Sequence, residues 1–407
     1  MPIHHMPYWL DRTSKARRPS YPPLRGNVDT TVVIVGGGLT GCACALAFAT
    51  AGVKVVLLEA EAIGQGGTAR GLGVVREDFD ARFRDTVAAH GLAAAGTMWQ
   101  GFRAASLELP AVLRRLDARC DLAPEDLLSF APLDPDSGRA LQREYKVRRD
   151  AGLRHSWLTP AAFARETALD SGGAIRTRGS KLDPYRACLA LAAAARGRGA
   201  TVHERSRVER IRAGQKHVEV ATNAGVVRAA TVLIATSAPL TDLRALRRHL
   251  KPHLDYSVLT APVPAFVRRS MGRRTAALRK DSRPPQFLRW VAGDRVLVSG
   301  GDQAELPARA REKALVQRTG QLMYELSLLY PDISGLAAES AWDTMHYETP
   351  DHLPFAGLHR NFPRHLFAMS GGRHGAAFPW LAARVLLRSF QGAPAKGDEL
   401  FGFSRVL

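Results

Sequence analysis

The sequence is poor in cysteine, with four in 407 residues. So few thiols do not make a disulfide framework in a chain of this length, and no pair has the CxxC spacing used by zinc or dithiol sites. Cys42 and Cys44 lie two apart on an expected helix, so they point to different faces and do not bind one metal together. The 13 histidines are scattered and form no HExxH pair. We therefore predict reduced cysteines and no metal site.

Long apolar runs are also missing. A membrane-spanning helix needs about 20 apolar residues, whereas the richest segments, 189–195 and 381–387, are short and flanked by arginine. The first residues lack the apolar core and cleavage site of a secretory signal. With 46% hydrophobic residues, a chain of this length buries a large core in two or three structural units. We expect a cytoplasmic protein with no membrane span.

Acidic residues are too few to balance the basic ones. The chain has 38 Asp and Glu but 57 Lys and Arg, which gives a net charge of +19. Such an excess attracts nucleic acid, anionic membranes or acidic small molecules. The basic residues are spread along the whole chain, and aromatic residues do not alternate with them as a base-stacking surface requires. Solvated faces of an arginine-rich protein are the favoured interpretation, and nucleic acid is not the expected partner.

The folded core is expected to begin near residue 28. Prolines and charges before it, together with Gly26, predict an extended arm over 1–27. The β-branched run at 31–35 predicts a strand buried on both faces. A small-residue helix at 42–51 and a second apolar strand at 53–58 follow, which together predict a βαβ unit.

The turn of this βαβ unit carries the spacing Gly36-x-Gly38-x-x-Gly41. Gly36 permits the tight turn, Gly38 lets a pyrophosphate approach, and Gly41 lets helix and strand pack closely. The helix N-terminus offers free N–H groups to phosphates. Glu59, 18 positions after Gly41, lies where an acid binds the ribose hydroxyls of adenosine. This context predicts a dinucleotide site.

A second glycine-rich run, at 64–73, follows directly after the second strand. Its backbone N–H groups and the hydroxyl of Thr68 could surround a pyrophosphate or a ribityl chain. A nicotinamide dehydrogenase does not need such a run at this place. The sequence therefore favours a flavin dinucleotide over a nicotinamide one.

Later segments repeat the alternation of helix and strand. We expect a helix at 185–197, a strand at 201–203, a hairpin of 218–221 with 226–227, and a buried strand at 231–235. Residues 81–142 are expected to be mainly helical, and 256–264 and 287–300 alternate as antiparallel strands do. These patterns predict a nucleotide-binding domain that is interrupted by pieces of a second domain.

Together these motifs resemble the D-amino-acid oxidase-like (DAO) family of FAD-dependent oxidoreductases, in the group of glycine oxidase, sarcosine oxidase and γ-glutamylputrescine oxidoreductase. The resemblance spans most of the chain. It is carried by the arm segment 8–11, the turn at 31–41, LLEA followed by GQGGTARGLG, 182–184, VLIATSAP at 232–239, ETPDHLP at 348–354 and LFAMSGGRHG at 366–375.

The resemblance implies an α/β fold: an FAD-binding Rossmann-like βαβ domain (28–80, 153–236 and 345–407) and an interleaved α+β substrate domain with an antiparallel sheet (81–152 and 237–344). It also implies roles by position, with adenine at the backbone of Val208 and the flavin pyrimidine beside 371–376. The expected cofactor-binding residues are Gly36, Gly38, Leu39, Thr40, Gly41, Glu59, Ala60, Gly67, Thr68, Ala69, Arg70, Gly71, Val208, Ala235, Thr236, Gly371, Gly372, Arg373, His374, Gly375 and Ala376. The sarcosine oxidase branch attaches its flavin to a cysteine, and 342–347 contains none, so we expect non-covalent FAD.

The family's chemistry is hydride transfer to flavin N5 from the carbon beside an amine, which leaves an imine that water hydrolyses. The expected substrate is a small amine or amino acid, whose carboxylate Arg289 would bind through its planar guanidinium. Trp290, Tyr256 and His374 are the other expected pocket residues. A surface arginine at 289, a tRNA-modification flavoenzyme and a flavin-bearing subunit of a heteromeric dehydrogenase remain alternatives. The electron acceptor, dioxygen or another, and the oligomeric state stay open.

Overall fold

The computed structural model describes residues 3–372 and 375–406, and two eight-stranded sheets organise them. The first sheet contains the predicted βαβ unit: β1 (Gly26–Val35), α2 (Leu39–Thr50) and β2 (Val55–Leu58), with β2 parallel to β1. Its other strands are β9 (Thr201–His203), β10 (Val208–Ala213), β11 (Val218–Thr222), β12 (Gly225–Ile234), β18 (Phe355–Leu358) and β19 (His365–Met369). The order is β10-β11-β12-β1-β2-β9, and β19 pairs with β12.

Three helices pack together beside the first sheet: α2, α8 (Pro184–Gly197) and α11 (Ala377–Phe390). Helix α2 is built almost entirely of small, buried residues, which lets its neighbours approach closely. All four cysteines are free and buried, and the Sγ atoms of Cys42 and Cys188 lie 3.6 Å apart between α2 and α8. The prediction of reduced cysteines agrees with this arrangement.

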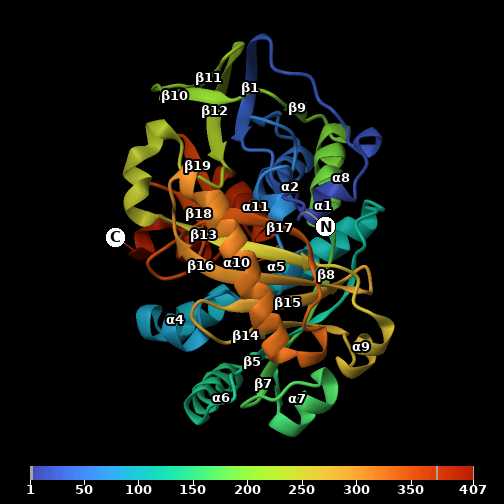
Figure 1. The fold of residues 1–407 in the computed structure, drawn as a ribbon. Coiled ribbons are helices and arrows are strands. Elements are labelled where there is room, and N and C mark those ends of the chain that lie inside the picture. Colours follow the sequence, from blue (N-terminus) through green and yellow to red (C-terminus); the bar gives the residue numbers. More distant parts are fainter. Residues whose placement is uncertain (1–2, 373–374, 407) are drawn as a thin grey trace.

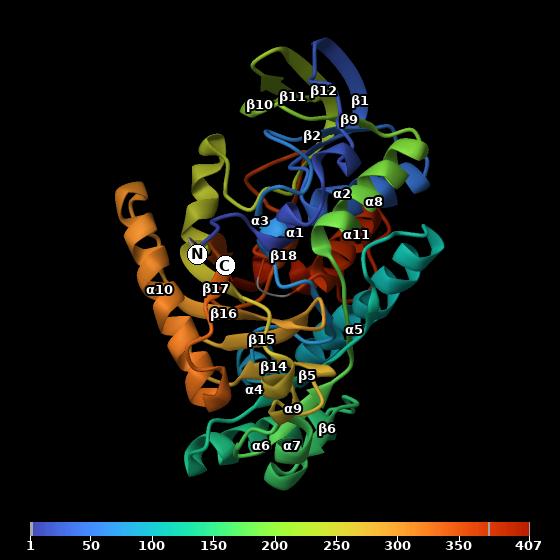
Figure 2. The ribbon, with the colours of Figure 1, turned by 45° about the vertical axis from the view of Figure 1, so that its right-hand side comes forward.

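The second sheet has the order β17-β13-β16-β15-β14-β5-β7-β6. Its strands are β5 (Asp126–Phe130), β6 (Ser156–Leu158), β7 (Ala174–Thr177), β13 (Lys251–Thr260), β14 (Ala276–Lys280), β15 (Gln286–Val291), β16 (Arg295–Ala304) and β17 (Ala338–Glu348). The long helix α10 (Ala308–Leu329) lies against β13, β16 and β17 at one side of the molecule (Figure 2). In Figure 1 the strands β1, β10, β11 and β12 lie at the top and β5 and β7 near the bottom.

The remaining elements lie outside the two large sheets. A third sheet has three strands in the order β3-β8-β4: β3 (Val74–Arg76), β4 (Ala123–Pro124) and β8 (Gly179–Lys181). The remaining α-helices are α1 (Tyr8–Asp11), α3 (Gly67–Arg70), α4 (Phe83–His90), α5 (Leu92–Arg115), α6 (Pro135–Asp150), α7 (Pro160–Thr167) and α9 (Ala265–Ser270). The 3-10 segments are η1 (Lys15–Arg17), η2 (Thr241–His249), η3 (Pro331–Ile333), η4 (Asp398–Phe401) and η5 (Phe403–Val406). No helix within the described residues is long and apolar enough to cross a membrane.

The structure corrects the prediction of an extended arm. Residues of the arm form α1 and η1, because Pro7 and Pro19 flank this stretch and interrupt neither short helix. Trp9 is buried, and its indole Nε1 donates a hydrogen bond to the carbonyl of Gly71 at 2.7 Å. The arm is therefore docked onto the glycine-rich segment.

The structure also differs from the expected strands and domain boundaries. Residues 225–234 form one continuous strand, where a hairpin arm and a separate strand were expected. Within 153–236, strands β6 and β7 pair through β5 into the second sheet, so this part does not belong with the first. In η2, Leu243 and Leu246 pack into the core of the first sheet, although 237 onward was expected in the second domain.

Candidate active site

A cavity of about 800 Å³ lies between the carboxyl ends of β1, β2 and β12 and the face of the second sheet. In open parallel sheets, ligands bind beyond the carboxyl ends of the strands. Most residues predicted to bind the cofactor line it: Gly36, Gly38, Leu39, Thr40, Glu59, Ala60, Gly67, Thr68, Arg70, Gly71, Val208, Ala235, Thr236, Gly371, Gly372, Gly375 and Ala376. Gly41 and Ala69 are not among the lining residues.

The glycines of the β1–α2 turn have different roles. Gly36 has a φ of +107°, and a β-carbon there would lie 2.8 Å from the carbonyl oxygen of Ala235. A β-carbon on Gly41 would lie 1.8 Å from the carbonyl oxygen of Gly36, so Gly41 permits the contact between helix and strand. A β-carbon on Gly38 would meet only the Thr68 hydroxyl, at 3.3 Å, and would otherwise project toward the cavity. The cavity at Gly38 is therefore kept open for a ligand.

Glu59 directly follows β2 and lines the cavity. Its carboxylate accepts hydrogen bonds from the backbone N–H of Gly37 at 2.6 Å and of Glu61 at 2.9 Å. Two backbone donors fix the orientation of the carboxylate beside the glycine turn. Val208 and the pair Ala235 and Thr236 line the adjoining part of the cavity, where the adenosine is expected.

The second glycine-rich run contains α3. The Thr68 hydroxyl accepts a hydrogen bond from the backbone N–H of Leu39 at 2.9 Å, which ties α3 to the first turn of α2. Arg70 donates to the backbone carbonyl of Asp343 at 2.9 Å, and its guanidinium lies 3.8 Å from the Asp343 carboxylate. Ala69 is fully buried behind this wall. The glycine-rich run thus lines one side of the cavity, and it links α2 beside the first sheet to β17 of the second sheet.

The loop after β19 contributes another part of the cavity wall. Ser370, Gly371 and Gly372 line the cavity, as do Gly375 and Ala376 just before α11. A β-carbon on Gly371 would lie 2.0 Å from the Phe378 ring, so only glycine fits there. Arg373 and His374, predicted to belong to this site, lie outside the described residues.

The cavity fits the expected dinucleotide. It joins the N-terminus of α2, which suits phosphates, to a fixed carboxylate at Glu59, which suits ribose hydroxyls. It then continues past α3 to the N-terminal end of α11. A helix N-terminus stabilises negative charge, as a reduced flavin ring requires.

Arg289 does not line this cavity. Its side chain is 5% exposed and donates hydrogen bonds to the carbonyls of Leu72 at 2.5 Å and Gly73 at 2.8 Å. Its Nε lies 3.5 Å from the Glu125 carboxylate, and its guanidinium lies over the Trp9 ring. Arg289 therefore holds the backbone of the glycine-rich run through these two hydrogen bonds and does not face the cavity.

Two further predicted pocket residues also lie away from the cavity wall. The Tyr256 ring is fully buried, and its hydroxyl accepts a hydrogen bond from the Gln303 amide at 2.6 Å. Trp290 packs beneath the guanidinium of Arg274, 5.1 Å from the ring centroid. Because side chains alternate along a strand, the neighbours of Tyr256, Asp255 and Ser257, face the cavity instead.

Sequence reasoning missed the wall that the second sheet contributes. Its lining residues are Asp255, Ser257, Phe287, Ser299, Thr344, Met345, His346 and Tyr347. The alternation of side chains along β13 was visible in the sequence, but alternation alone does not tell which of the two faces of the strand lines the cavity. Only the position of the sheet shows that the face with Asp255 is the one turned to the cavity.

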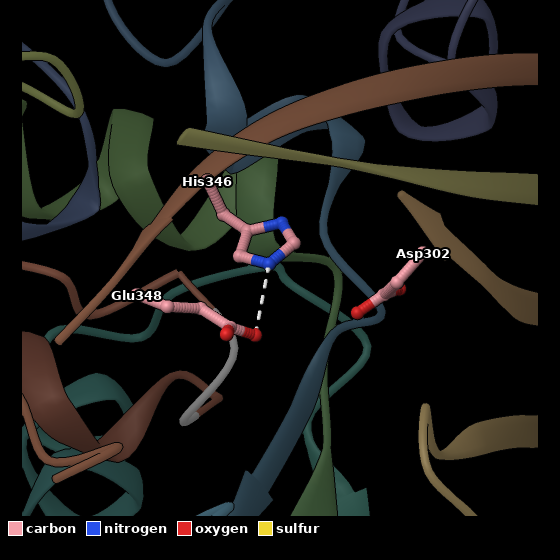
Figure 3. A group of neighbouring side chains, drawn as sticks. All are labelled: Asp302, His346 and Glu348. Carbon is pink, nitrogen blue, oxygen red and sulfur yellow. Dashed lines mark ion pairs between the residues drawn. The ribbon is translucent and has the colours of Figure 1, made fainter. Parts of the chain in front are cut away.

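A group of three potential metal ligands lies at the edge of this wall. Asp302 comes from β16, whereas His346 and Glu348 come from β17, and their ligand atoms lie within 4.8 Å of one another (Figure 3). His346 Nε2 is 3.6 Å from Glu348, as is His253 Nε2. These imidazoles, His346 foremost, lower the pKa of Glu348 although burial opposes them. We predicted no metal site because the sequence contains no short, regular spacing of metal ligands. A group whose members come from two different strands has no such spacing.

Known proteins share this arrangement. The chain is 25% identical over 382 residues to the γ-glutamylputrescine oxidoreductase of Escherichia coli (strain K12), covering 92% of this chain and 87% of the relative. Glycine oxidase from Geobacillus kaustophilus superposes with a TM-score of 0.72 at 20% identity, over 93% of this chain and 100% of the other. L-Proline dehydrogenase from P. horikoshii gives 0.73 at 17% identity, over 93% and 97%.

The fold of the two sheets is therefore the fold of these enzymes, as the sequence predicted. The profile of the family described as FAD dependent oxidoreductase (DAO) matches residues 31–388, which includes both glycine-rich runs, the second sheet and most of α11. The chain belongs to this family of FAD-dependent oxidoreductases.

Proposed function

We propose that this enzyme binds FAD without a covalent bond and oxidises the C–N bond of a small amine or amino acid. The observation that carries the proposal is the continuous cavity, which runs from the dinucleotide turn at Gly38 to a polar wall of the second sheet at Asp255. One end of that cavity suits the adenosine and pyrophosphate, and the other leaves a wall for a small substrate.

Non-covalent binding is supported by the positions of the cysteines. None of the four lines the cavity, and all are buried. In the stretch where the sequence resemblance places the attachment cysteine of the sarcosine oxidase branch, the cavity-lining residues are Thr344, Met345, His346 and Tyr347. No cysteine thiol is available there to form a thioether with the flavin.

The relatives favour an amine substrate. The name of the Escherichia coli relative describes an oxidoreductase of a putrescine derivative, and the similar solved structures include a glycine oxidase and an L-proline dehydrogenase. Each of these names contains a compound with an amine nitrogen. We propose the same class of substrate for this chain.

Bound FAD would supply the acceptor for a hydride from the carbon beside the amine nitrogen, and water would hydrolyse the imine that remains. The protein's part is to orient that carbon and to admit the amine in its neutral form, because only the neutral nitrogen can donate its lone pair as the hydride leaves. The wall of Ser257, Phe287 and Thr344 supplies a mixed apolar and polar surface that can hold a small molecule against the flavin.

The test is an anaerobic screen of amines and amino acids against the purified protein. A substrate is expected to bleach the flavin absorbance without dioxygen, and heating the protein is expected to release FAD into solution. Readmission of dioxygen then shows whether it serves as the electron acceptor. A colourless protein that takes up no flavin would refute the cofactor assignment, and a coloured protein that no amine bleaches would refute the substrate class.

A further inference from the structure

The backbone carbonyls of the second glycine-rich run are held from outside the cavity. Four consecutive carbonyls, those of residues 70–73, each accept a hydrogen bond from a large side chain. The donors are Trp342 Nε1 at 3.1 Å from the Arg70 oxygen, Trp9 Nε1 at 2.7 Å from that of Gly71, and Arg289 at 2.5 Å from Leu72 and 2.8 Å from Gly73. All four residues of the run line the cavity, whereas none of the three donor side chains does.

The position of these donors determines which way the peptide groups of the run face. In a trans peptide the carbonyl oxygen of one residue and the N–H of the next point in opposite directions. Because the carbonyls of Gly71 and Leu72 are drawn toward donors outside the cavity, the N–H groups of Leu72 and Gly73 are turned toward it. Neither N–H donates a hydrogen bond to another described residue. The run therefore presents two backbone donors on the cavity wall.

These two donors lie toward the end of the cavity where the flavin ring is expected. Val74 directly follows the run, and its carbonyl accepts a hydrogen bond at 3.0 Å from the N–H of Ala376, just before α11. N–H groups beside the ring stabilise the negative charge that a flavin gains on reduction, and a carbonyl in the same place would oppose it. The orientation of each peptide in the run thus bears on the cofactor.

Gly71 could adopt either orientation at little conformational cost, because glycine lacks a β-carbon and tolerates most backbone angles. The hydrogen bond from Trp9 selects the orientation in which the Gly71 carbonyl points away from the cavity. Without it, the peptide between Gly71 and Leu72 could reverse and replace a donor on the wall with an acceptor.

Trp9 belongs to the N-terminal arm, which lies along the outside of the cavity. The backbone of His4 makes two hydrogen bonds to β17, at 2.9 and 3.1 Å. Helix α1, which contains Trp9, lies against α3 (Figure 2). Farther along the arm, the N–H of Leu24 donates at 2.8 Å to the hydroxyl of Ser206, which lines the cavity near Val208. The arm is thus attached to the second sheet, to the glycine-rich run and to the adenosine end of the cavity wall.

We infer that Trp9 is a positioning residue for the flavin, which it serves by holding the Gly71 carbonyl away from the cavity. Arg289 does the same for the peptide that follows. The docked arm then slows the release of FAD and favours its reduced state. This inference rests on the non-covalent FAD of the proposed function and not on its amine substrate.

The test is Trp9→Phe in the FAD-loaded enzyme. Phenylalanine keeps an aromatic ring beneath the Arg289 guanidinium and lacks the N–H donor. The fluorescence of released FAD after dilution gives its dissociation rate, which we expect to rise about three- to tenfold, the effect of one lost hydrogen bond. Equilibration with a reference dye gives the reduction potential of the bound flavin, which we expect to become more negative than in the wild type.

Trp99→Phe is the matched control. Trp99 is also buried, and its ring packs against Phe79 and Phe83 away from the cavity. Its Nε1 has no hydrogen-bond partner among the described residues, so this variant removes the same indole without removing a hydrogen bond. It should lower the melting temperature of the apoprotein and leave the FAD dissociation rate and the potential at their wild-type values.

Three results would overturn the inference. The first is an unchanged FAD dissociation rate and potential in Trp9→Phe. The second is an equal acceleration of FAD release in Trp99→Phe, because lost stability alone would then explain both variants. The third is faster release from Trp9→Phe with an unchanged potential, which would mean that the indole acts by packing and does not orient the peptide.

Failure of the proposed function gives different results. If flavin stays attached to the wild-type protein after acid precipitation, non-covalent binding is wrong, and the potentials of the wild type and Trp9→Phe still decide the role of Trp9. If no amine bleaches the flavin, the proposed substrate class is wrong, and both measurements keep their meaning because neither uses a substrate.

Discussion

Gly41 and Gly36 approach so closely that a β-carbon on Gly41 would lie 1.8 Å from the carbonyl oxygen of Gly36. Because that oxygen belongs to the backbone of the turn, it cannot turn aside as a flexible side chain could. Gly41→Ala is therefore expected to push α2 away from β1 and to destabilise the protein by about 3 kcal/mol, the upper part of the range for overpacking. Thermal unfolding of the apoprotein measures this loss.

Gly96→Ala is the control for this substitution, since it lies within α5 and has no atom within 4 Å of its added β-carbon. It should leave stability unchanged or raise it slightly, because alanine favours a helix more than glycine does. An unchanged melting temperature for Gly41→Ala would mean that the turn can open without cost.

Gly38→Val should separate cofactor binding from folding. The added β-carbon would meet only the Thr68 hydroxyl, at 3.3 Å, and otherwise projects to the cavity where the pyrophosphate is expected. We expect an apoprotein of nearly normal stability that no longer takes up FAD. Unfolding of the apoprotein and flavin fluorescence titration measure the two quantities, and retained FAD affinity would place the pyrophosphate elsewhere.

Glu59→Ala should weaken FAD binding by about 1.5–3 kcal/mol, the range for a hydrogen bond to a charged group. The same carboxylate accepts hydrogen bonds from the N–H groups of Gly37 and Glu61. Because Glu59→Gln keeps one acceptor oxygen, this variant should lose less affinity for FAD than the alanine variant. Equal Kd values for FAD in all three proteins would remove Glu59 from the cofactor site.

The cofactor half of the site could be predicted because its parts are local in sequence. The turn at Gly36, Gly38 and Gly41 and the acid at Glu59 belong to one βαβ unit, where spacing alone determines what faces the ligand. The structure brings Gly36, Gly38 and Glu59 to one cavity with Thr68 and Val208, which come from other elements.

The substrate half could not be predicted in the same way. Arg289 and Asp255 both lie on strands of the second sheet, and a strand pattern does not say which face meets the first domain. That choice depends on how the two sheets pack, through contacts between residues far apart in the chain. The arm was misjudged for a related reason, since α1 is stabilised by the burial of Trp9 and its hydrogen bond to Gly71.

Arg289→Ala is expected to act on stability rather than on substrate affinity. The buried guanidinium donates to the carbonyls of Leu72 and Gly73 and lies 3.5 Å from Glu125, which would be left without this neighbour. Breaking a buried charge pair costs about 3–5 kcal/mol, and because Lys181 Nζ still lies 3.4 Å from Glu125, the loss should fall near the lower end of that range. Arg289→Lys should recover only part of this loss, because an ammonium lacks the planar set of donors.

Unfolding in denaturant and steady-state kinetics distinguish the two roles of Arg289. A fall in unfolding free energy with a modest change in KM fits the position seen in the structure. A stable variant with a strongly raised KM for a carboxylate-bearing amine, and unchanged KM for one without a carboxylate, would restore Arg289 as a substrate-binding residue.

His155 should make the stability of the protein depend on pH. Burial, together with the nearby guanidinium of Arg148, lowers the pKa of His155 to about 4. Its Nε2 lies 3.6 Å from Glu77, and because the imidazole is neutral at pH 7 this contact is not an ion pair there. In the unfolded chain a histidine has a pKa of about 6.5. Between these two values the unfolded state binds the extra proton, so the contribution of His155 is present above pH 6.5 and is lost as the pH falls toward 4.

The free energy of unfolding should therefore drop by about 2 kcal/mol through His155 between pH 8 and pH 5. Glu77 titrates with the opposite sign, since burial raises its pKa, so the comparison of wild type with His155→Gln isolates the histidine. Denaturant unfolding at the two pH values should show the wild type losing about 2 kcal/mol more than this variant. His217→Gln removes an exposed imidazole and should keep the wild-type dependence. If His155→Gln also kept it, the imidazole would have to be protonated in the folded protein, and its contact with Glu77 would then be an ion pair.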